Sequence, residues 1–479
     1  MKGVIGIGAA AAVLLPSFCL AQTKSPNVIL LMADDLGWGD VGFNGNEWIK
    51  TPVLDSMARN GIVLSNFYTA SSVSSPTRAS VLTGRNPYRT GVFSANTGIL
   101  RPEEVTIAEV LKAHGYNTGH FGKWHLGTLT YSEVDANRGK VGNMKEYNPP
   151  ALHGYDEAFV TESKVPTWDP MKKPVGKKKN AGWKYLEPDD EWEPFGTSYW
   201  DIGGQKVTEN LDGDDSRVIM DRVIPFIDSS VGNNQQFLAV VWFHAPHLPC
   251  VAGPEYSEMY KDYDLQQRNY AGCITAMDAQ IGRLLKHLKE TGVDKNTVIF
   301  FCSDNGPENG TPGTTGVFRE RKRSLHEGGI RVPSVVYWPG RINPKVSDCL
   351  TSTMDYFPTI IELTGADRSI AKNMVDGKSF ADILTKDRVS DDTKSVTLLH
   401  GKQVACVKGK YKMYNNQGNY ELYNIRRDPS ESKDLSKSRP RRLKKMIALS
   451  ESFIQSYKSS FLGDEYGTAS LERTGQRWD

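Results

Sequence analysis

The sequence predicts an α/β fold, with a mixed, mostly parallel sheet between helices and a smaller C-terminal α+β domain carrying an antiparallel sheet. Four continuous apolar runs predict the sheet, because strands buried on both faces need apolar side chains at nearly every position. These runs span 27–33, 237–243, 297–302 and 332–338. Helical patterns separate them, and alternating strands and helices are typical of layered α/β folds.

The clearest helical pattern lies between the second and third apolar runs. Apolar residues recur there on one helical face, and the pattern ends before Gly292, a residue type that often follows a helix. The face is formed by Tyr270, Ile274, Met277, Ile281, Leu284, Leu285 and Leu288. We therefore expect a long amphipathic helix packed on the sheet.

The segment 128–203 lacks any periodicity and is rich in Lys, Trp, Pro and acidic residues. We interpret it as an irregular surface loop. The functional alternative is an insertion that binds an anionic sugar, since long loops on a rigid scaffold often carry specificity. Its basic run comprises Lys172, Lys173, Lys177, Lys178 and Lys179.

The pattern changes from about residue 386. Short strand-like pieces follow one another there, and a helix-like segment with Leu443, Met446 and Phe453 comes after them. The pieces span 395–399, 403–408, 410–414 and 420–423. We expect a main domain over 22–385 and a C-terminal α+β domain over 386–479.

The first residues have the order of a secretory signal peptide. Met1-Lys2 precede an apolar stretch at about 4–15, and a small-residue cleavage pattern ends at Ala21. We predict a signal peptide over 1–21 and a secreted or periplasmic protein. No other stretch approaches the roughly 20 apolar residues that span a bilayer.

Charge and cysteine content exclude some classes of partner. The chain has 479 residues and a formal net charge of only +2, which gives no support for a nucleic-acid partner. Of its 6 cysteines, Cys19 falls in the predicted signal peptide. None forms a CxxC pair, so the sequence does not indicate zinc or thioredoxin-like chemistry, and it leaves disulfide bonding open.

Two acidic clusters follow apolar runs. Asp34 and Asp35 end the first run, and Asp304 and Asn305 follow the third. A parallel sheet would bring these strand ends together, where ligands bind in open α/β sheets. Carboxylates so close require a cation, and all-oxygen ligation suits Ca²⁺ or Mg²⁺. Independent turn or capping roles for each pair are the alternative.

Ser74 begins a second group of candidate site residues. Pro76 and Gly84 mark the two ends of a helix, so Ser74 lies at or before its N-terminus, where free N–H groups favour anions. Taken alone, Ser74 is interpreted as a helix cap. Lys123 and His125 follow a strand-like piece and would project to one side in extended backbone.

Basic and titratable residues follow two further strands. His244 and His247 come directly after the second apolar run. The segment 318–322 ends in Lys322 and leads on to Glu327-Gly328-Gly329. Cationic and titratable groups at several strand ends describe an anion site with acid–base capability. A charged loop and structural histidines are the alternatives.

These elements, in this order, resemble the type I, formylglycine-dependent sulfatases of the alkaline-phosphatase-like superfamily. The residues SSPTR at 74–78 are similar to the family's C/S-x-P-x-R maturation signature. Other segments typical of the family are LTGR at 82–85, GKWHLG at 122–127, DNG at 304–306, EGGIRVP at 327–333, and ELYN at 421–424. The resemblance covers nearly all of the mature chain and implies an alkaline-phosphatase-like fold.

The resemblance also implies the chemistry. Ser74 would be oxidised to formylglycine (3-oxoalanine) by a separate sulfatase-maturating radical enzyme of the bacterial, anaerobic type. Asp34, Asp35, Asp304, Asn305 and modified Ser74 would bind Ca²⁺. Arg78 would favour the ionised nucleophile, and Lys123, Lys322 and His247 would hold the sulfate. His247, or alternatively Lys322, would protonate the leaving oxygen, with His125 as the base. His244 would also face the substrate.

The expected substrate is a sulfated saccharide outside the cell. By overall similarity to galactosamine-type sulfatases we expect a galactose or N-acetylhexosamine sulfate in a glycosaminoglycan, mucin or algal glycan. Lys164, Trp168 and His153 are candidate subsite residues. Two alternatives stay open: a phosphomonoester or phosphonate hydrolase of the same superfamily, and a glycan-binding protein without catalysis.

Overall fold

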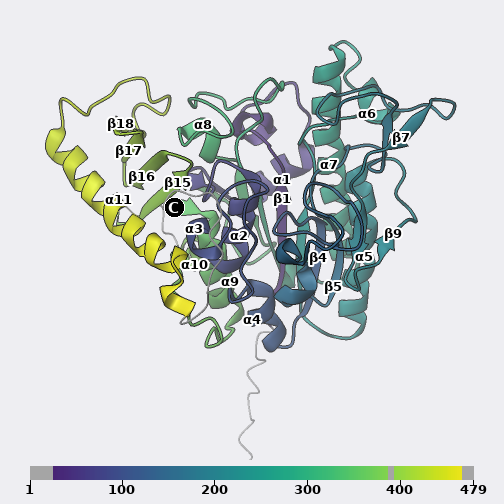
Figure 1. The fold of residues 1–479 in the computed structure, drawn as a ribbon, viewed down its shortest axis with the longest axis horizontal. Coiled ribbons are helices and arrows are strands. Elements are labelled where there is room, and N and C mark those ends of the chain that lie inside the picture. The colour runs from purple at the N-terminus through teal and green to yellow at the C-terminus, as the bar shows by residue number, and fades with distance from the viewer. Residues whose placement is uncertain (1–24, 387–392, 467–479) are drawn as a thin grey trace, which may run out of the picture.

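A computed structural model describes residues 25–386 and 393–466 (Figure 1). The predicted signal peptide and Cys19 lie outside the described residues. The other five cysteines are all buried free thiols. Among the residues described, no helix has both the length and the apolar character needed to cross a membrane.

The centre of the fold is a ten-stranded sheet, and β1 (Asn27–Ala33) lies in its middle. β1 pairs in parallel with β10 (Phe237–Trp242) on one side and β11 (Thr297–Ser303) on the other. β4 (Asn117–Lys123) and β5 (Glu157–Thr161) continue the parallel part beyond β10. The predicted mixed, mostly parallel sheet is confirmed.

Successive side chains of β1 enter two different cores, because a strand turns alternate residues to opposite faces. Val28, Leu30 and Met32 belong to one core. Ile29 and Leu31 belong to the other. The first core is covered by α2 (Ser74–Thr83), α4 (Ile107–Ala113) and α9 (Tyr356–Thr364). The second is covered by α1 (Pro52–Asn60), α5 (Asp215–Gly232) and the predicted long helix, α7 (Leu265–Glu290) (Figure 1).

The C-terminal part contains a four-stranded antiparallel sheet, as predicted, which lies beside the main sheet at the left of Figure 1. Its strands are β15 (Ser395–His400), β16 (Gln403–Lys408), β17 (Tyr411–Asn416) and β18 (Asn419–Asn424). The long helix α11 (Pro440–Phe461) packs against them through apolar residues such as Met446 and Tyr457. The sheet is therefore apolar on both faces: α11 covers one, and residues such as Leu325 and Met354 of the main part of the chain pack against the other.

Two expectations require correction. The fourth apolar run forms β12 (Ser334–Tyr337), but this strand is antiparallel to β11. The segment 128–203 is not only loop, because β5 and β8 (Tyr199–Asp201) join the main sheet, and β6 (Lys172–Pro174) pairs with β7 (Trp192–Pro194). These strands are too short for a periodic pattern to show. The remaining strands of the main sheet are β2 (Ile62–Leu64), β9 (Lys206–Val207) and β13 (Lys345–Ser347).

Buried arginines tie the main part of the chain to α11. Arg89 donates to Ser460 Oγ at 2.7 Å and pairs with Asp376 at 2.9 Å. Arg101 donates to the carbonyl oxygens of Ser460 at 3.0 Å and Phe461 at 3.1 Å. Arg89 and Arg101, which precede the last turn of α11 by more than 300 residues, thus donate hydrogen bonds to it.

A second buried link connects the C-terminal sheet to the main part of the chain. Lys412 on β17 pairs with Glu327 at 2.9 Å and with Glu431 at 3.0 Å, and all three side chains are inaccessible to solvent. Tyr68, from the short strand β3 (Phe67–Tyr68), donates to the other Glu327 oxygen at 2.7 Å. Opposite charges and hydrogen bonds therefore satisfy a buried polar cluster.

Replacing Lys412 by methionine is expected to lower the free energy of unfolding by about 3–5 kcal/mol, because two buried carboxylates would lose their closest cation. Urea unfolding followed by fluorescence measures the change. The control is Lys408→Met on the neighbouring strand, where the lysine is exposed. Equal stability of the two variants would contradict a structural role for the cluster.

Candidate active site

The two acidic pairs meet where β1 and β11 end. Ala33 and Ser303 are partners in the parallel register, so the residues that follow them lie side by side. The backbone N–H of Asp35 donates to Asp304 Oδ1 at 3.0 Å, and Asn305 Nδ2 donates to Asp35 Oδ1 at 2.6 Å. All four side chains are buried.

Ser74 lies directly against this cluster. It is the first residue of α2, and the helix ends at Gly84 with a left-handed φ of 69°. Its Oγ donates to Asp34 Oδ1 at 3.1 Å and lies 3.5 Å from Asn305 Oδ1. A hydroxymethyl group at a helix N-terminus thus contacts both acidic pairs.

Each of the three carboxylates has a different closest cationic partner. Lys123 Nζ lies 2.6 Å from Asp34 Oδ2. Lys322 Nζ lies 2.7 Å from Asp35 Oδ2, and Arg78 donates to Asp304 Oδ2 at 2.8 Å. These cations come from β4, from the loop before Glu327 and from α2, so the fold gathers them from distant parts of the sequence.

Burial raises the pKa values of the buried carboxylates, whereas the positive charges beside them lower these values. Burial alone raises the pKa of Asp34, but the positive charges of Lys123, His247, Arg78 and Lys322 outweigh it and hold the pKa well below its usual range. Burial, with the negative charge of Asp34 added, raises the pKa of Asp304 to about 7. Burial therefore disfavours the ionised form of Asp304, which a bound divalent cation would stabilise.

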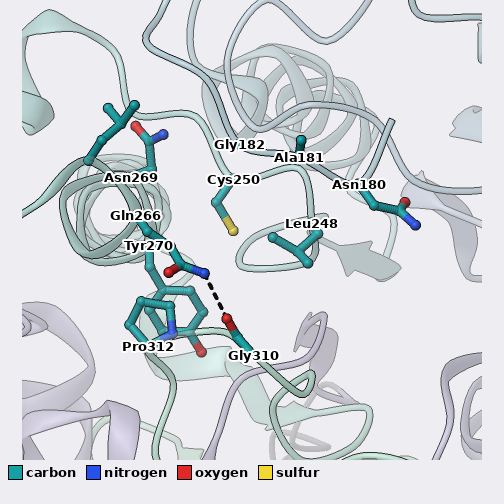
Figure 2. A pocket seen from close by; sticks show the side chains of 11 residues that line it. Asn180, Ala181, Gly182, Leu248, Cys250, Gln266, Asn269, Tyr270, Gly310 and Pro312 are labelled. Atoms are coloured by element: carbon teal, nitrogen blue, oxygen red, sulfur yellow. Dashed lines mark hydrogen bonds between the residues drawn. The ribbon is translucent and has the colours of Figure 1, made fainter. Parts of the chain in front are cut away.

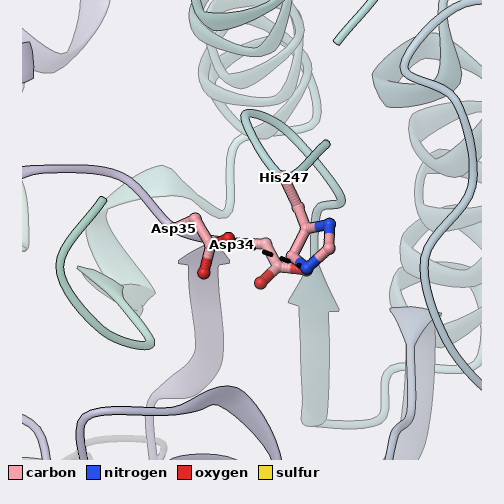
Figure 3. Close-up of side chains that lie close together, drawn as sticks. All are labelled: Asp34, Asp35 and His247. Atoms are coloured by element: carbon pink, nitrogen blue, oxygen red, sulfur yellow. Dashed lines mark ion pairs between the residues drawn. The ribbon is translucent and has the colours of Figure 1, made fainter. Parts of the chain in front are cut away.

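His125, which follows β4, and His247, which follows β10, both lie near the acidic cluster. Figure 3 shows the His247 ring directed toward Asp34 and Asp35, and its Nε2 lies 3.7 Å from Asp35 Oδ2. His125 Nε2 is 2.8 Å from Asn96 Oδ1. Burial lowers the pKa of both rings. His125 has a φ of 61°, so the extended backbone expected after Lys123 is wrong, because β4 ends at that lysine.

His244 does not face the substrate side, contrary to expectation. Its side chain is 0% exposed, and both ring nitrogens have partners: Asp215 Oδ2 at 2.8 Å and Thr161 Oγ at 2.7 Å. Tyr199 donates to the other Asp215 oxygen at 2.6 Å. The ring is therefore part of a buried polar chain that runs from α5 to β5.

The three candidate subsite residues lie in three different environments. Burial and the positive charges of Lys123 and Lys322 lower the pKa of Lys164 to about 8, which places its ammonium near the anion site. Trp168 packs in a small apolar cluster with Trp183. His153 is fully buried and bonds Asn148 at 2.9 Å, so the sequence-based subsite role is wrong for it.

A pocket of about 400 Å³ lies next to the His247 loop (Figure 2). Leu248 and Cys250 line it from that loop, and Tyr270 lines it from α7. Asn180, on its rim, accepts a hydrogen bond from Lys164. The segment 128–203 therefore contributes part of the wall of this pocket.

Two residues that touch the site cannot be identified from the sequence. Asn96 holds His125, and Glu308 lies 3.4 Å from Lys322 Nζ. Neither belongs to a pattern that the sequence makes visible, because both act through partners far along the chain. Asp215, the partner of His244, was missed for the same reason.

The donor set fits a hard divalent cation. Asp34, Asp35, Asp304, Asn305 and Ser74 all present oxygen atoms, which is the ligand type that Ca²⁺ and Mg²⁺ prefer. The imidazole of His247 offers a possible nitrogen ligand, since single ligand atoms of Asp34, Asp35 and His247 lie within 4.8 Å of one another. Buried polar atoms without partners, including Arg78 Nε and His125 Nδ1, lie beside this set among the described residues.

Comparison with known proteins identifies sulfatases as relatives of this chain. The Sulfatase family profile matches residues 26–366, and that of the N-sulphoglucosamine sulphohydrolase C-terminal region matches 313–455. N-acetylgalactosamine-6-sulfatase of Homo sapiens is 31% identical over 394 residues, covering 77% of this chain and 67% of its own. Arylsulfatase G of Rattus norvegicus is 32% identical over 378 residues, covering 72% and 66%.

Solved structures agree. The crystal structure of Ps i-CgsB in complex with k-i-k-neocarrahexaose superposes with a TM-score of 0.76 at 27% identity, covering 90% of this chain and 93% of that one. A phosphonate monoester hydrolase of Agrobacterium radiobacter, at 17% identity and a TM-score of 0.61, shares the fold. The chain belongs to the sulfatase family, in the alkaline-phosphatase-like superfamily, and is a sulfuric ester hydrolase.

Proposed function

We propose that the protein removes sulfate from a carbohydrate, with Ser74 oxidised to formylglycine and Ca²⁺ bound beside it. One observation carries the proposal: Ser74 Oγ contacts both Asp34 and Asn305. A nucleophile made from this side chain would lie at the metal ligands and at a helix N-terminus, where anions are stabilised.

Asp34, Asp35, Asp304, Asn305 and the oxidised Ser74 would hold the cation. When bound, Ca²⁺ would stabilise the ionised form of the nucleophile. The hydrated aldehyde of oxidised Ser74 would supply the hydroxyl that attacks sulfur. Lys123, Arg78 and Lys322 already neutralise the three carboxylates, so metal and sulfate would add charges of opposite sign to a balanced site.

The chain's own residues would complete the reaction. Lys123 and Lys322 can each turn a free N–H toward the sulfate oxygens while keeping their carboxylate partners. His247, or alternatively Lys322, would donate the proton to the leaving sugar oxygen. His125 would take a proton from the second hydroxyl, and Asn96 holds the ring in place for this.

The proposed substrate is a galactose or N-acetylhexosamine sulfate in a glycosaminoglycan, mucin or algal glycan. The names of two similar proteins support it, one an N-acetylgalactosamine-6-sulfatase and the other solved with a neocarrahexaose. The Lys164 ammonium adds positive charge next to the anion site. Cleavage of a signal peptide at about residue 21 would deliver the enzyme to such glycans.

Co-expression with an anaerobic-type sulfatase-maturating enzyme tests the proposal. Mass spectrometry of the peptide with Ser74 is expected to show the loss of two hydrogens. The matured protein should release sulfate from sulfated monosaccharides faster than phosphate from the matching phosphate esters. A faster phosphate reaction would favour the phosphomonoester or phosphonate hydrolase, and binding of sugars without conversion of Ser74 would favour a glycan-binding protein.

Replacing Asn96 by alanine is expected to lower kcat by roughly 10-fold with little change in KM, because outer partners that orient a reactive side chain are typically worth 10–100-fold. Steady-state kinetics on a sulfated monosaccharide measures both constants. Asn60→Ala, at the exposed end of α1, is the control. A pure KM effect would show that Asn96 binds the substrate instead of positioning His125.

A further inference from the structure

A second pocket lies between the main part of the chain and the C-terminal sheet. Its volume is about 910 Å³. One wall is the turn that contains Ser94 and Thr97, which is closed by a backbone hydrogen bond of 3.2 Å. The opposite wall is formed by two hairpin turns of the C-terminal sheet, at Lys402 and at Gln417.

This pocket adjoins the active site at two corners. Asn96, in the turn between Ser94 and Thr97, contacts His125 at 2.8 Å. At the other corner, the positive charge of Arg323 acts on His400, and Arg323 pairs with Glu308, which lies 3.4 Å from Lys322. A ligand held at Ser74 and extending toward the C-terminal sheet would enter this pocket.

The lining suits a sugar that carries a negative charge. Hydroxyl and amide groups come from Ser94, Thr97, Asn415 and Gln417, and no acidic side chain lines the pocket. Lys402 is exposed and makes no ion pair with the described residues. His400 has a buried Nδ1 that lacks a hydrogen-bond partner there. Burial and the nearby Arg323 lower the pKa of His400, so its neutral ring can both donate and accept near pH 7.

The size of the pocket indicates how much of the substrate it holds. Ligand pockets are usually about 300–1,000 Å³, so this one is at the upper end. The sulfated sugar itself must lie at Ser74, outside the pocket. The space is therefore available to the units that precede or follow it in an oligosaccharide.

We propose that the pocket between the 94–97 turn and the two hairpin turns binds the sugar units next to the sulfated one, and that Lys402 recognises an anionic group on them. The proposal rests on the proposed carbohydrate sulfatase function. It makes the substrate an oligosaccharide with at least two anionic groups, and it gives the C-terminal sheet a role in selecting it.

The test compares long and short substrates with the matured full-length protein. The probes are N-acetylgalactosamine 6-sulfate, a chondroitin 6-sulfate tetrasaccharide with carboxylates on neighbouring units, and a carrageenan tetrasaccharide with sulfates there. Lys402→Glu is expected to lower kcat/KM for one or both tetrasaccharides by about 10-fold, mainly through KM. His400→Gln should cause a smaller loss, and the monosaccharide rate should change less than 2-fold.

Lys408→Glu is the matched control, since it makes the same charge change at an exposed position of β16 outside the pocket. The tetrasaccharide that loses most activity identifies the anionic group. An equal effect of Lys402→Glu on all three probes, or the same loss in Lys408→Glu, would overturn the proposal.

A binding measurement separates this proposal from the proposed function. Calorimetry of the Ser74→Ala protein with the two tetrasaccharides needs no catalysis. Binding that weakens about 10-fold in the Lys402→Glu background supports the pocket even if no probe is hydrolysed. Absence of binding by the Ser74→Ala protein to both tetrasaccharides at millimolar concentration, or binding unaffected by Lys402→Glu, rejects the pocket whatever the fate of the sulfatase reaction.

Discussion

Ser74→Ala protein is expected to release sulfate at least about 10⁴-fold more slowly than matured wild type, because the variant has no group that can become the nucleophile. The side chain is buried, and alanine keeps the first turn of α2 while deleting only the contacts of Oγ with Asp34 and Asn305. Ion chromatography of free sulfate after long incubation measures the residual rate.

Ser75→Ala is the control for this experiment. Ser75 is equally buried in the same helical turn, and its Oγ has no hydrogen-bond partner among the described residues. Its removal should leave the rate within a few-fold of wild type. A Ser74→Ala protein that kept a tenth of the wild-type rate would assign the nucleophile to another group and end the formylglycine proposal.

Asp304→Ala is expected to lower sulfate release by about 10³-fold, because it removes a proposed metal ligand and leaves Arg78 without its closest carboxylate. A second measurement does not depend on activity. Wild type should gain about 2.7 kcal/mol of stability at a Ca²⁺ concentration 100 times the Kd. Asp304→Ala should lose most of this gain, as measured by thermal unfolding with and without Ca²⁺.

The exposed Asp262 offers a control for Asp304, since Asp262→Ala removes one negative charge at a position outside the cluster. This variant should keep both the activity and the Ca²⁺-dependent increase in Tm. If Asp304→Ala still gains full stability from Ca²⁺, the cation binds elsewhere, for instance at the Asp34, Asp35 and His247 group.

The residues at the strand ends could be predicted from the sequence to lie together, whereas the hydrogen-bond partners of the histidine rings could not be predicted. Continuous apolar runs predict buried parallel strands, and parallel strands bring Asp34 and Asp304 to one edge. In contrast, His244 and His247 are three residues apart with similar neighbours in sequence. The partners that hold His244 inward are Asp215 on α5 and Thr161 on β5. Such information lies in tertiary contacts that no local pattern contains.

The short strands could not be predicted from the sequence for a related reason. β5 and β8 have only five and three residues, and the polar segments around them hide any alternation. The C-terminal strands were easier to predict, because four similar strand-like pieces follow each other with short turns between them. Lys322 could be selected by its spacing from Glu327, but its contact with Asp35 depends on a loop that the sequence does not fix.

The arginine contacts of α11 bear on how this chain can be divided. Arg101 and Arg89 are buried, and the carbonyl and hydroxyl groups they need are supplied by residues 456–461. A fragment that ended before α11 would remove these acceptors from two buried guanidinium groups, leaving Arg89 its pairing with Asp376 and Arg101 its bond to the Arg89 carbonyl. It would also expose the core around them, and both effects are costly. The main part of the chain and α11 therefore stabilise each other, and we expect a growing polypeptide to complete these contacts only after α11 has emerged.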